Sequence, residues 1–191
     1  MEEIEAKFLE VDPKAMEKKL LGLGAVKKYD RIFRDRVFDF SGWPLDKDKA
    51  WLRLRDKGDK VTLSFKKRFG VSATGDAGME EVEIKVDDFE KTTQILEKLG
   101  MEQKFNEEKR RAHFELDGVD VDIDTFPLMP SYLEIEGKSW GEVENVAERL
   151  GLDWEKRRSL SAMQIYKEYG VEEKEYKVLT FEKQIKRSVR L

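Results

Sequence analysis

The stretch MEEIEAK at residues 1–7 returns almost unchanged as MEEVEIK at residues 79–85, with Glu, Glu and Lys two positions apart in both copies. Residues two apart on a strand point to the same face, so each copy predicts a strand with one charged and one apolar face. Two copies in one chain indicate a duplicated unit. A duplicated unit in turn suggests a site to which both copies contribute.

The duplication extends well beyond these seven residues. Each half is predicted to contain a strand, a helix that ends in Leu-Gly and three further strands. The matching segments are RDRVFD (34–39) with RRAHFE (110–115), AWLRLRD (50–56) with VDVDIDT (119–125), and TLSFKK (62–67) with YLEIEG (132–137). Two βαβββ units supply eight strands, and eight antiparallel strands can close without exposed edges. We therefore predict an α+β fold, an eight-stranded antiparallel β-barrel with helices packed outside.

Period-two alternation sets the expected strands, and capping residues set the expected helices. Strands are predicted at residues 2–9, 33–40, 50–57, 60–68, 79–86, 109–117, 119–126 and 131–137. Helices are predicted at residues 13–23, 88–99, 139–150, 160–169 and 178–188. The small, polar loop 70–78 joins pseudo-repeats of about 1–70 and 79–137. We expect a single domain over residues 1–191, with C-terminal helices in 139–191.

Charged residues make up 41% of the 191 residues, against about 25% in an average globular chain, and the net charge is −4. The absence of cysteine excludes disulfides and thiolate metal sites, and the single histidine, His113, excludes a multi-histidine zinc centre. The negative net charge argues against a nucleic-acid partner. No apolar run approaches membrane-spanning length and nothing resembles a signal peptide. We expect a cytoplasmic protein that binds neither nucleic acid nor membrane.

The charged strand faces carry both signs, which decides between two interpretations. For one strand alone, a solvated outer face is the simpler explanation. If helices cover the apolar faces from outside, however, the charged faces line the bore. Unpaired buried charges cost several kcal/mol each, so such a bore must hold water, ions and ligand. A lining of both signs suits a polyphosphate held by Arg and Lys, with Mg²⁺ or Mn²⁺ held by carboxylate oxygens.

Several of these charges form motifs in a fixed order along residues 1–137. They are ExExK (Glu3, Glu5, Lys7), RxR (Arg53, Arg55), the strand lysine Lys66, KxR (Lys109, Arg111), Asp124 before a turn, and ExE (Glu134, Glu136). This ordered set resembles the CYTH domain, the triphosphate tunnel metalloenzymes. That family includes class IV adenylyl cyclases, thiamine triphosphatases and inorganic triphosphatases. The resemblance implies a tunnel that binds a triphosphate together with a divalent cation.

The resemblance also implies roles for individual residues. The metal ligands would be Glu3, Glu5, Glu134 and Glu136, with Asp124 assisting. The phosphate-binding residues would be Lys7, Arg53, Arg55, Lys66, Lys109 and Arg111. The catalytic residues would be Glu5, Lys7 and Glu136. Further candidates for the site are Glu81, Glu83, Lys85 and Asp122.

The leading hypothesis is a divalent-metal-dependent triphosphatase that hydrolyses a small molecule: inorganic tripolyphosphate, a nucleoside triphosphate or another organic triphosphate. The alternative is a class IV adenylyl cyclase, which converts ATP to cyclic AMP and pyrophosphate. A polyphosphate-binding module without turnover is the third. Class IV cyclases carry a His-Phe pair a few residues before ExExK, whereas only Met1 and Glu2 precede Glu3 here. The predicted C-terminal helix could cover one tunnel mouth or form a homodimer contact.

Overall fold

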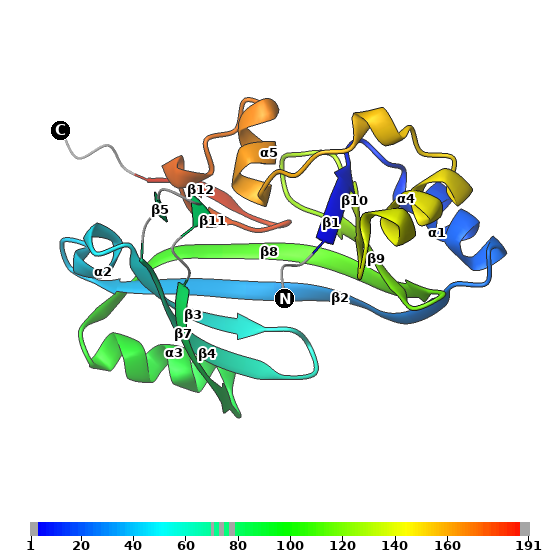
Figure 1. The fold of residues 1–191 in the computed structure, drawn as a ribbon. Helices are drawn as coiled ribbons and strands as arrows, with labels where there is room; N and C mark the ends of the chain where they lie inside the picture. The colour runs from blue at the N-terminus through cyan, green and yellow to red at the C-terminus, as the bar shows by residue number, and fades with distance from the viewer. Residues whose placement is uncertain (1–3, 70, 73–74, 77–78, 188–191) are drawn as a thin grey trace. The chain divides into compact units, whose positions relative to one another are not determined.

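The computed structural model describes residues 4–69, 71–72, 75–76 and 79–187. The chain divides into two compact units. Unit 1 contains Met1–Ile32 and Lys109–Lys174, and unit 2 contains Phe33–Glu108 and Glu175–Leu191. Two long strands, β2 (Val26–Phe40) and β8 (Met101–Leu116), contribute residues to both units (Figure 1). Both strands extend well beyond the predicted segments 33–40 and 109–117.

The order of elements confirms the two predicted βαβββ units. The first consists of β1 (Ile4–Phe8), α1 (Pro13–Gly22), β2, β3 (Ala50–Asp56) and β4 (Val61–Arg68), with the short α2 (Pro44–Lys47) inserted before β3. The second consists of β7 (Met79–Val86), α3 (Phe89–Lys98), β8, β9 (Val119–Thr125) and β10 (Tyr132–Gly137). The strand order is β1-β10-β9-β8-β2-β3-β4-β7. The class is α+β as predicted, but within the described residues β1 and β7 do not pair, so the sheet is not strictly closed.

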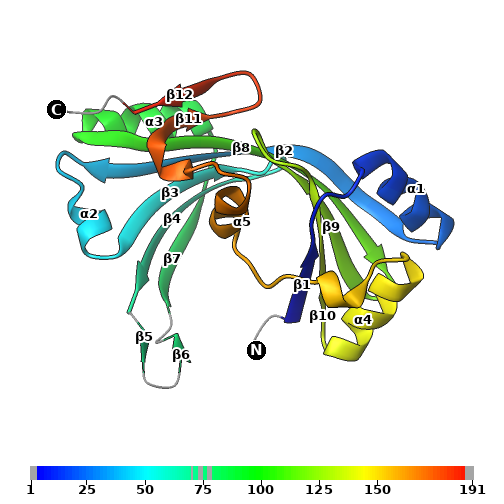
Figure 2. The ribbon, with the colours of Figure 1, turned by 90° about the horizontal axis from the view of Figure 1, so that it is seen from above.

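In unit 1 the helices α1 and α4 (Trp140–Arg149) pack on one face of β1, β9 and β10 (Figure 2). α1 begins where the sequence predicts, because Asp12 accepts hydrogen bonds from the backbone N–H groups of Lys14 and Ala15 and Pro13 takes the first helical position. α4 begins at the predicted Ser139 cap, whose hydroxyl accepts from the backbone N–H of Glu142. The two caps fix where each helix begins.

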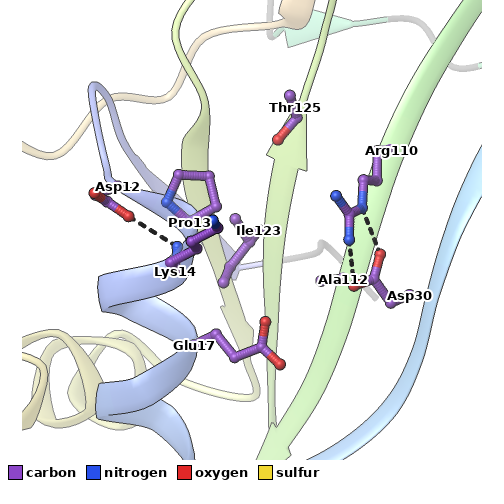
Figure 3. A pocket seen from close by; sticks show the side chains of 9 residues that line it. All are labelled: Asp12, Pro13, Lys14, Glu17, Asp30, Arg110, Ala112, Ile123 and Thr125. Carbon is purple, nitrogen blue, oxygen red and sulfur yellow. Dashed lines mark hydrogen bonds and ion pairs between the residues drawn. The ribbon is translucent and has the colours of Figure 1, made fainter.

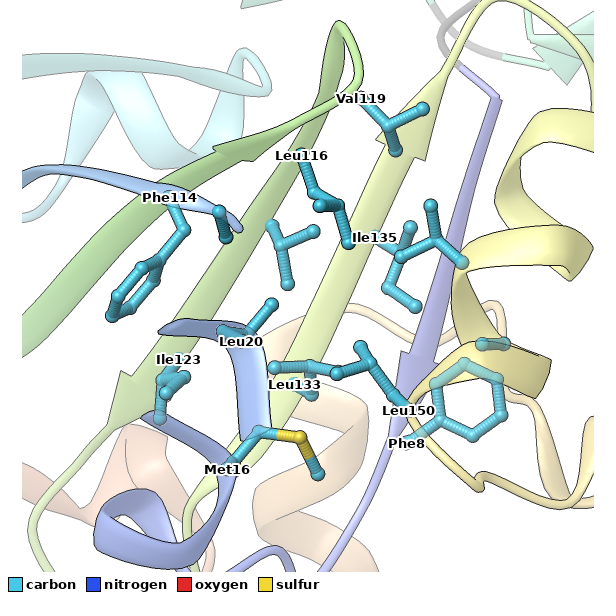
Figure 4. Packing of buried hydrophobic residues seen from close by; sticks show 14 of the residues in the cluster. Phe8, Met16, Leu20, Phe114, Leu116, Val119, Ile123, Leu133, Ile135 and Leu150 are labelled. Atoms are coloured by element: carbon cyan, nitrogen blue, oxygen red, sulfur yellow. The ribbon is translucent and has the colours of Figure 1, made fainter. Parts of the chain in front are cut away.

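The core of unit 1 lies between these helices and the apolar face of the strands (Figure 4). Phe8, Leu133 and Ile135 from the strands meet Leu20 of α1 and Leu150, the residue that follows α4, and all five are buried. Replacing one of these leucines by alanine would cost about 2–5 kcal/mol of stability. Because side chains alternate along a strand, the charged residues between these positions lie on the opposite face.

In unit 2 the sheet consists of the first half of β8, the second half of β2, and β3, β4 and β7. Phe38 and Leu54 from the strands pack with Phe89 and Leu96 of α3 in a second core. β5 (Val71–Ser72) and β6 (Gly75–Asp76) form a small antiparallel pair within the predicted loop 70–78. The rest of that loop lies outside the described residues.

The C-terminal region agrees with the prediction except in its last element. The helix predicted at residues 160–169 is α5 (Ala162–Glu168), and two short 3₁₀ turns are η1 (Trp154–Lys156) and η2 (Glu173–Glu175). The helix predicted at residues 178–188 is wrong. β11 (Tyr176–Leu179) and β12 (Gln184–Lys186) form an antiparallel hairpin there, and β11 pairs in parallel with β8.

The reason for this hairpin is the exposed edge that β8 presents beyond the end of β9. Val178 and Leu179 pair with Asn106 and Glu107 on that edge, and Leu179 becomes completely buried. A helix could not have satisfied the backbone groups of β8 in this way. No helix among the described residues is long and apolar enough to cross a membrane.

Candidate functional site

The charged face of the unit 1 sheet brings together the predicted ExExK and ExE motifs. Glu5 on β1 lies directly opposite Glu136 on β10, and Lys7 lies opposite Glu134. Glu3 lies outside the described residues. The antiparallel register therefore places the acids and the lysine of the two motifs in adjoining rows.

Lys7 is the cationic centre of this arrangement. Its side chain is almost completely buried and forms ion pairs with Glu5 and with Glu134, the latter at 3.0 Å between Nζ and Oε2. Burial alone would lower the pKa of Lys7, but the charges of Glu134 and Glu5 outweigh it and hold that pKa above its usual value. Lys7 is therefore a protonated ammonium group held between two carboxylates.

Arg111 and Asp124 form a second largely buried ion pair on this face. Arg111 Nε and Nη2 donate to the two carboxylate oxygens of Asp124 at 2.7 and 2.6 Å, and Lys109 Nζ donates to Oδ2 at 3.1 Å. Burial alone would raise the pKa of Asp124. The positive charges of Lys109 and Arg111 lower this pKa by more than burial raises it, so it lies below its usual value. Both cations of the predicted KxR motif thus donate hydrogen bonds to Asp124. Arg111 Nη2 also donates to Glu134 Oε1 at 3.1 Å.

A second group of side chains surrounds Asp122, a further predicted candidate. His113 Nδ1 lies 2.7 Å from Asp122 Oδ1, and the Tyr29 ring stacks on the His113 ring with centroids 4.9 Å apart. Arg111 Nη1 also pairs with Asp122. Burial raises the pKa of Asp122, with Arg111 and His113 opposing this rise. His113 therefore lies on the charged face.

Tyr132 links Asp124 to helix α5. The Tyr132 hydroxyl donates to Asp124 Oδ2 at 3.3 Å, and the Tyr132 ring stacks on Phe126, with centroids 5.8 Å apart. Tyr166 of α5 meets Phe126 edge-on at 5.9 Å. Burial raises the pKa of Tyr132, and Asp124 raises it further, so the phenol stays protonated. α5 thus packs, through Tyr166 and Phe126, against the residue that donates to Asp124 on the charged face of unit 1.

Unit 2 carries the remaining predicted cations. Arg55 Nε donates to Asp35 Oδ1 at 2.6 Å, and a second hydrogen bond joins Nη2 to the other oxygen of this buried carboxylate. Lys66 Nζ pairs with Glu81 at 2.8 Å. Arg53 lies on the same face of β3 as Arg55.

The remaining candidates in unit 2 are exposed residues of β7. Glu83 lies opposite Ser64 on β4, and Lys85 lies opposite Thr62. Their register places them on the same face as Lys66.

The carboxylates of unit 1 fit a hard divalent cation by donor type, since Mg²⁺ and Mn²⁺ prefer oxygen ligands. Across the part of the chain that the structure describes, no three acidic side chains form a ready ligand group. Glu5 and Glu134 turn to Lys7, and Asp124 turns to Arg111 and Lys109. Among the described members of the predicted ligand set, Glu5 and Glu136, which face each other across β1 and β10, are the more exposed.

A cavity of about 520 Å³ lies on the other face of the unit 1 sheet, at the start of α1 (Figure 3). Pro13 and Glu17 of α1 line it together with Ile123 of β9 and the ion pair of Arg110 with Asp30, at 2.7 and 2.8 Å. Ile123 belongs to the apolar face of β9, opposite Asp122 and Asp124. This cavity is therefore separate from the charged face.

Sequence reasoning missed Tyr29, Asp35 and Tyr132 as parts of these clusters. Tyr132 could have been found, because it has the same parity as Glu134 and Glu136 on one strand. Asp35 could have been found by pairing segment 34–39 with segment 50–56 as a hairpin, since Asp35 then lies opposite Arg55. Tyr29 gave no such signal, because the charged run before residue 33 lacks alternation.

Solved structures share this fold at low sequence identity. A protein of Pyrococcus horikoshii OT3 is 24% identical, with 86% of this chain and 99% of that chain covered and a TM-score of 0.59. A candidate adenylate cyclase of Vibrio parahaemolyticus is 14% identical, with 86% and 97% covered and a TM-score of 0.62. A candidate adenylyl cyclase of Hippeastrum, described as having a dominant triphosphatase activity, is 20% identical, with 89% and 97% covered and a TM-score of 0.58. These likenesses show the fold.

No curated protein matches the chain. The family model of the CYTH domain matches residues 1–180. That range contains every motif residue of the two charged faces and both βαβββ units. The chain therefore belongs to the CYTH domain family.

Proposed function

We propose that this protein hydrolyses a small-molecule triphosphate in a reaction that requires Mg²⁺ or Mn²⁺. The observation that carries the proposal is the opposed pair of Glu5 and Glu136 beside the buried ammonium group of Lys7 on one face of unit 1. Carboxylates at such a place bind a hard cation, and a buried cation at the same place binds phosphate oxygens. Membership of the CYTH family supports the same chemistry. So does the triphosphatase activity described for the Hippeastrum protein.

In this proposal Glu3, Glu5, Glu134 and Glu136 hold the divalent cation. Asp124 assists by fixing Arg111 rather than through free oxygens, because its carboxylate already accepts hydrogen bonds from Arg111, Lys109 and Tyr132. A bound divalent cation would supply charge neutralisation at the phosphate oxygens and a bound water of lowered pKa.

Each unit has cations that we propose as phosphate-binding residues. Unit 1 supplies Lys7, Lys109 and Arg111, and unit 2 supplies Arg53, Arg55 and Lys66. Lys7 stays protonated because its carboxylate partners raise its pKa, so it can stabilise charge that develops on a transferred phosphoryl group. Glu5, Lys7 and Glu136 are thus the proposed catalytic residues. Neighbouring charges adjust the electrostatic potential of the two charged faces in this proposal; they are Glu81, Glu83, Lys85 and Asp122.

The decisive experiment offers the purified chain tripolyphosphate, ATP and thiamine triphosphate, each with Mg²⁺, with Mn²⁺ or with EDTA. We expect orthophosphate release from at least one substrate and none in EDTA. Cyclic AMP with pyrophosphate from ATP would instead identify a cyclase. Tight binding of all three compounds without any product would identify a binding module.

A further inference from the structure

Three buried polar atoms in unit 2 have no hydrogen-bond partner among the described residues: Arg36 Nε, Arg53 Nε and Ser64 Oγ. The guanidinium of Arg36 is held through its other nitrogens by Glu90 and Thr93 of α3, so Arg53 and Ser64 remain as the candidates for a ligand. Ser64 is 1% exposed. The two residues are direct cross-strand partners in the β3–β4 register, so their side chains lie on the same face and are neighbours. A buried donor without a partner costs about 1–3 kcal/mol, and two adjacent ones point to a ligand that satisfies both.

The next row of the same two strands shows the contrast. Arg55 lies opposite Thr62, and its Nε is satisfied by the buried carboxylate of Asp35. Neither Arg55 Nε nor the Thr62 hydroxyl is a buried atom without a partner. Of these two neighbouring rows on one face, only that of Arg53 and Ser64 therefore has buried atoms without a hydrogen-bond partner, although each row pairs an arginine with a hydroxyl residue.

We propose that the Ser64 hydroxyl is a substrate-binding group, which donates a hydrogen bond to a phosphoryl oxygen that Arg53 holds through Nε. This proposal rests on the proposed function, because it takes the ligand to be a triphosphate. It adds Ser64 to the phosphate-binding residues, and it divides the two arginines. Arg53 contacts phosphate with its full charge, whereas Arg55 contacts it with a charge that Asp35 already balances in part.

The charges around Arg53 favour this reading. Burial lowers the pKa of Arg53, and the neighbouring Arg55 charge lowers it further, more than the acids Asp35, Glu81 and Glu107 raise it. A phosphate oxygen would relieve both effects. The hydroxyl of Ser64 rotates about a single bond and can turn toward an oxygen held by Arg53. Glu83 lies opposite Ser64 on the other side but is exposed to solvent, which weakens its repulsion of the anion.

The test measures the dissociation constant of tripolyphosphate by calorimetry in EDTA, so that anion binding is separated from metal binding and turnover. We expect Ser64→Ala to weaken binding about tenfold, which corresponds to about 1.4 kcal/mol. Ser64→Thr keeps the hydroxyl and should bind within about threefold of the wild-type protein. Thr62→Val is the matched control, because it removes a buried hydroxyl from the neighbouring row, and it should change binding less than twofold.

The free protein should not lose thermal stability in Ser64→Ala, since the lost hydroxyl has no partner in the fold. If that variant fails to fold, Ser64→Cys replaces the hydroxyl with a weak donor of similar size and serves the same comparison. Equal affinity of the wild-type protein and Ser64→Ala, or an equal loss in Thr62→Val, would overturn the role of Ser64. Either result is independent of the proposed function, which is judged by product release with metal. Binding that depends on Ser64 without any turnover would retain this inference and reject the triphosphatase.

Discussion

Arg111 and Asp124 face each other across β8 and β9 and share two hydrogen bonds, at 2.7 and 2.6 Å, in a place where the Asp124 side chain has no exposure at all. Lys109 and Tyr132 complete the partners of this carboxylate. An ion pair this deeply buried stabilises the fold only while both partners are present, because each charge alone carries a large desolvation cost.

Asp124→Asn should therefore destabilise the metal-free protein. The amide keeps the shape of the carboxylate but leaves Arg111 and Lys109 without their common counter-charge. Breaking a buried pair costs about 3–5 kcal/mol, and we expect a loss of about 3 kcal/mol in the free energy of unfolding, measured by urea denaturation in EDTA. The control is Asp120→Asn on the same face of β9, where the side chain is half exposed; it should change stability by less than about 0.5 kcal/mol. Equal stability of both variants would show that the Arg111 pair is not structural.

The opposed carboxylates of β1 and β10 should behave differently. Glu5→Gln and Glu136→Gln each remove one negative charge from the proposed cation site, and we expect each to lower turnover at least about 100-fold with either Mg²⁺ or Mn²⁺. Both side chains are partly exposed, so the fold and the melting temperature in EDTA should be retained. Turnover would be measured as orthophosphate release at saturating metal. Full activity of both variants would show that these carboxylates do not bind the cation.

The element order could be predicted because repetition and alternation are properties of single strands and helices. The two ExExK copies predict β1 and β7. In β10, Leu133 and Ile135 alternate with Glu134 and Glu136, and this alternation predicts one apolar and one charged face. These patterns can be recognised in the sequence because they depend only on the local geometry of one strand, in which successive side chains point to opposite faces.

The pairing of charges could not be predicted in the same way. That Asp35 rather than a ligand neutralises Arg55, and that Arg53 has a buried unsatisfied atom, depends on cross-strand register. The helix predicted at residues 178–188 was wrong for a similar reason, since this segment has a helical amphipathic pattern but its first residues, Val178 and Leu179, pair with the edge of β8. Strand edges recruit distant segments, and propensity does not reveal where an edge is free.

The ion pair of Asp30 with Arg110, on the apolar side of unit 1, predicts a pH effect (Figure 3). The hydrogen bonds from Arg110 hold the pKa of Asp30 below its usual value, burial opposes this, and Lys27 adds to the lowering. A lowered pKa in the folded state stabilises the protein above the unfolded pKa of about 3.9, and this contribution is lost as the pH falls through the folded pKa. We expect a double-mutant cycle of Asp30→Asn and Arg110→Leu to give a coupling of at most about 1 kcal/mol at pH 7, because the Arg110 side chain is largely exposed.

The same cycle should give a shrinking coupling free energy as the pH is lowered from about 5 towards 2. Urea denaturation of the four proteins at each pH measures it. A coupling that is constant over this range, or that grows at low pH, would show that the pair does not lower the Asp30 pKa.

Ligand binding should separate the two arginines of β3. Tripolyphosphate with Mg²⁺ at about one hundred times its dissociation constant should add about 2.7 kcal/mol to the stability of the wild-type protein, which raises the melting temperature by roughly 5–10 °C for a chain of this size. Orthophosphate at equal charge concentration should raise the melting temperature much less, because it is shorter than a triphosphate and contacts fewer cations.

Arg53→Ala should leave the melting temperature of the free protein unchanged, since Arg53 Nε has no hydrogen bond in the fold to lose. The same variant should abolish most of the shift caused by tripolyphosphate. Arg55→Ala should lower the melting temperature of the free protein, because Asp35 is then buried without its guanidinium, and should keep a larger part of the shift. A larger loss of the shift in Arg55→Ala than in Arg53→Ala would contradict this assignment.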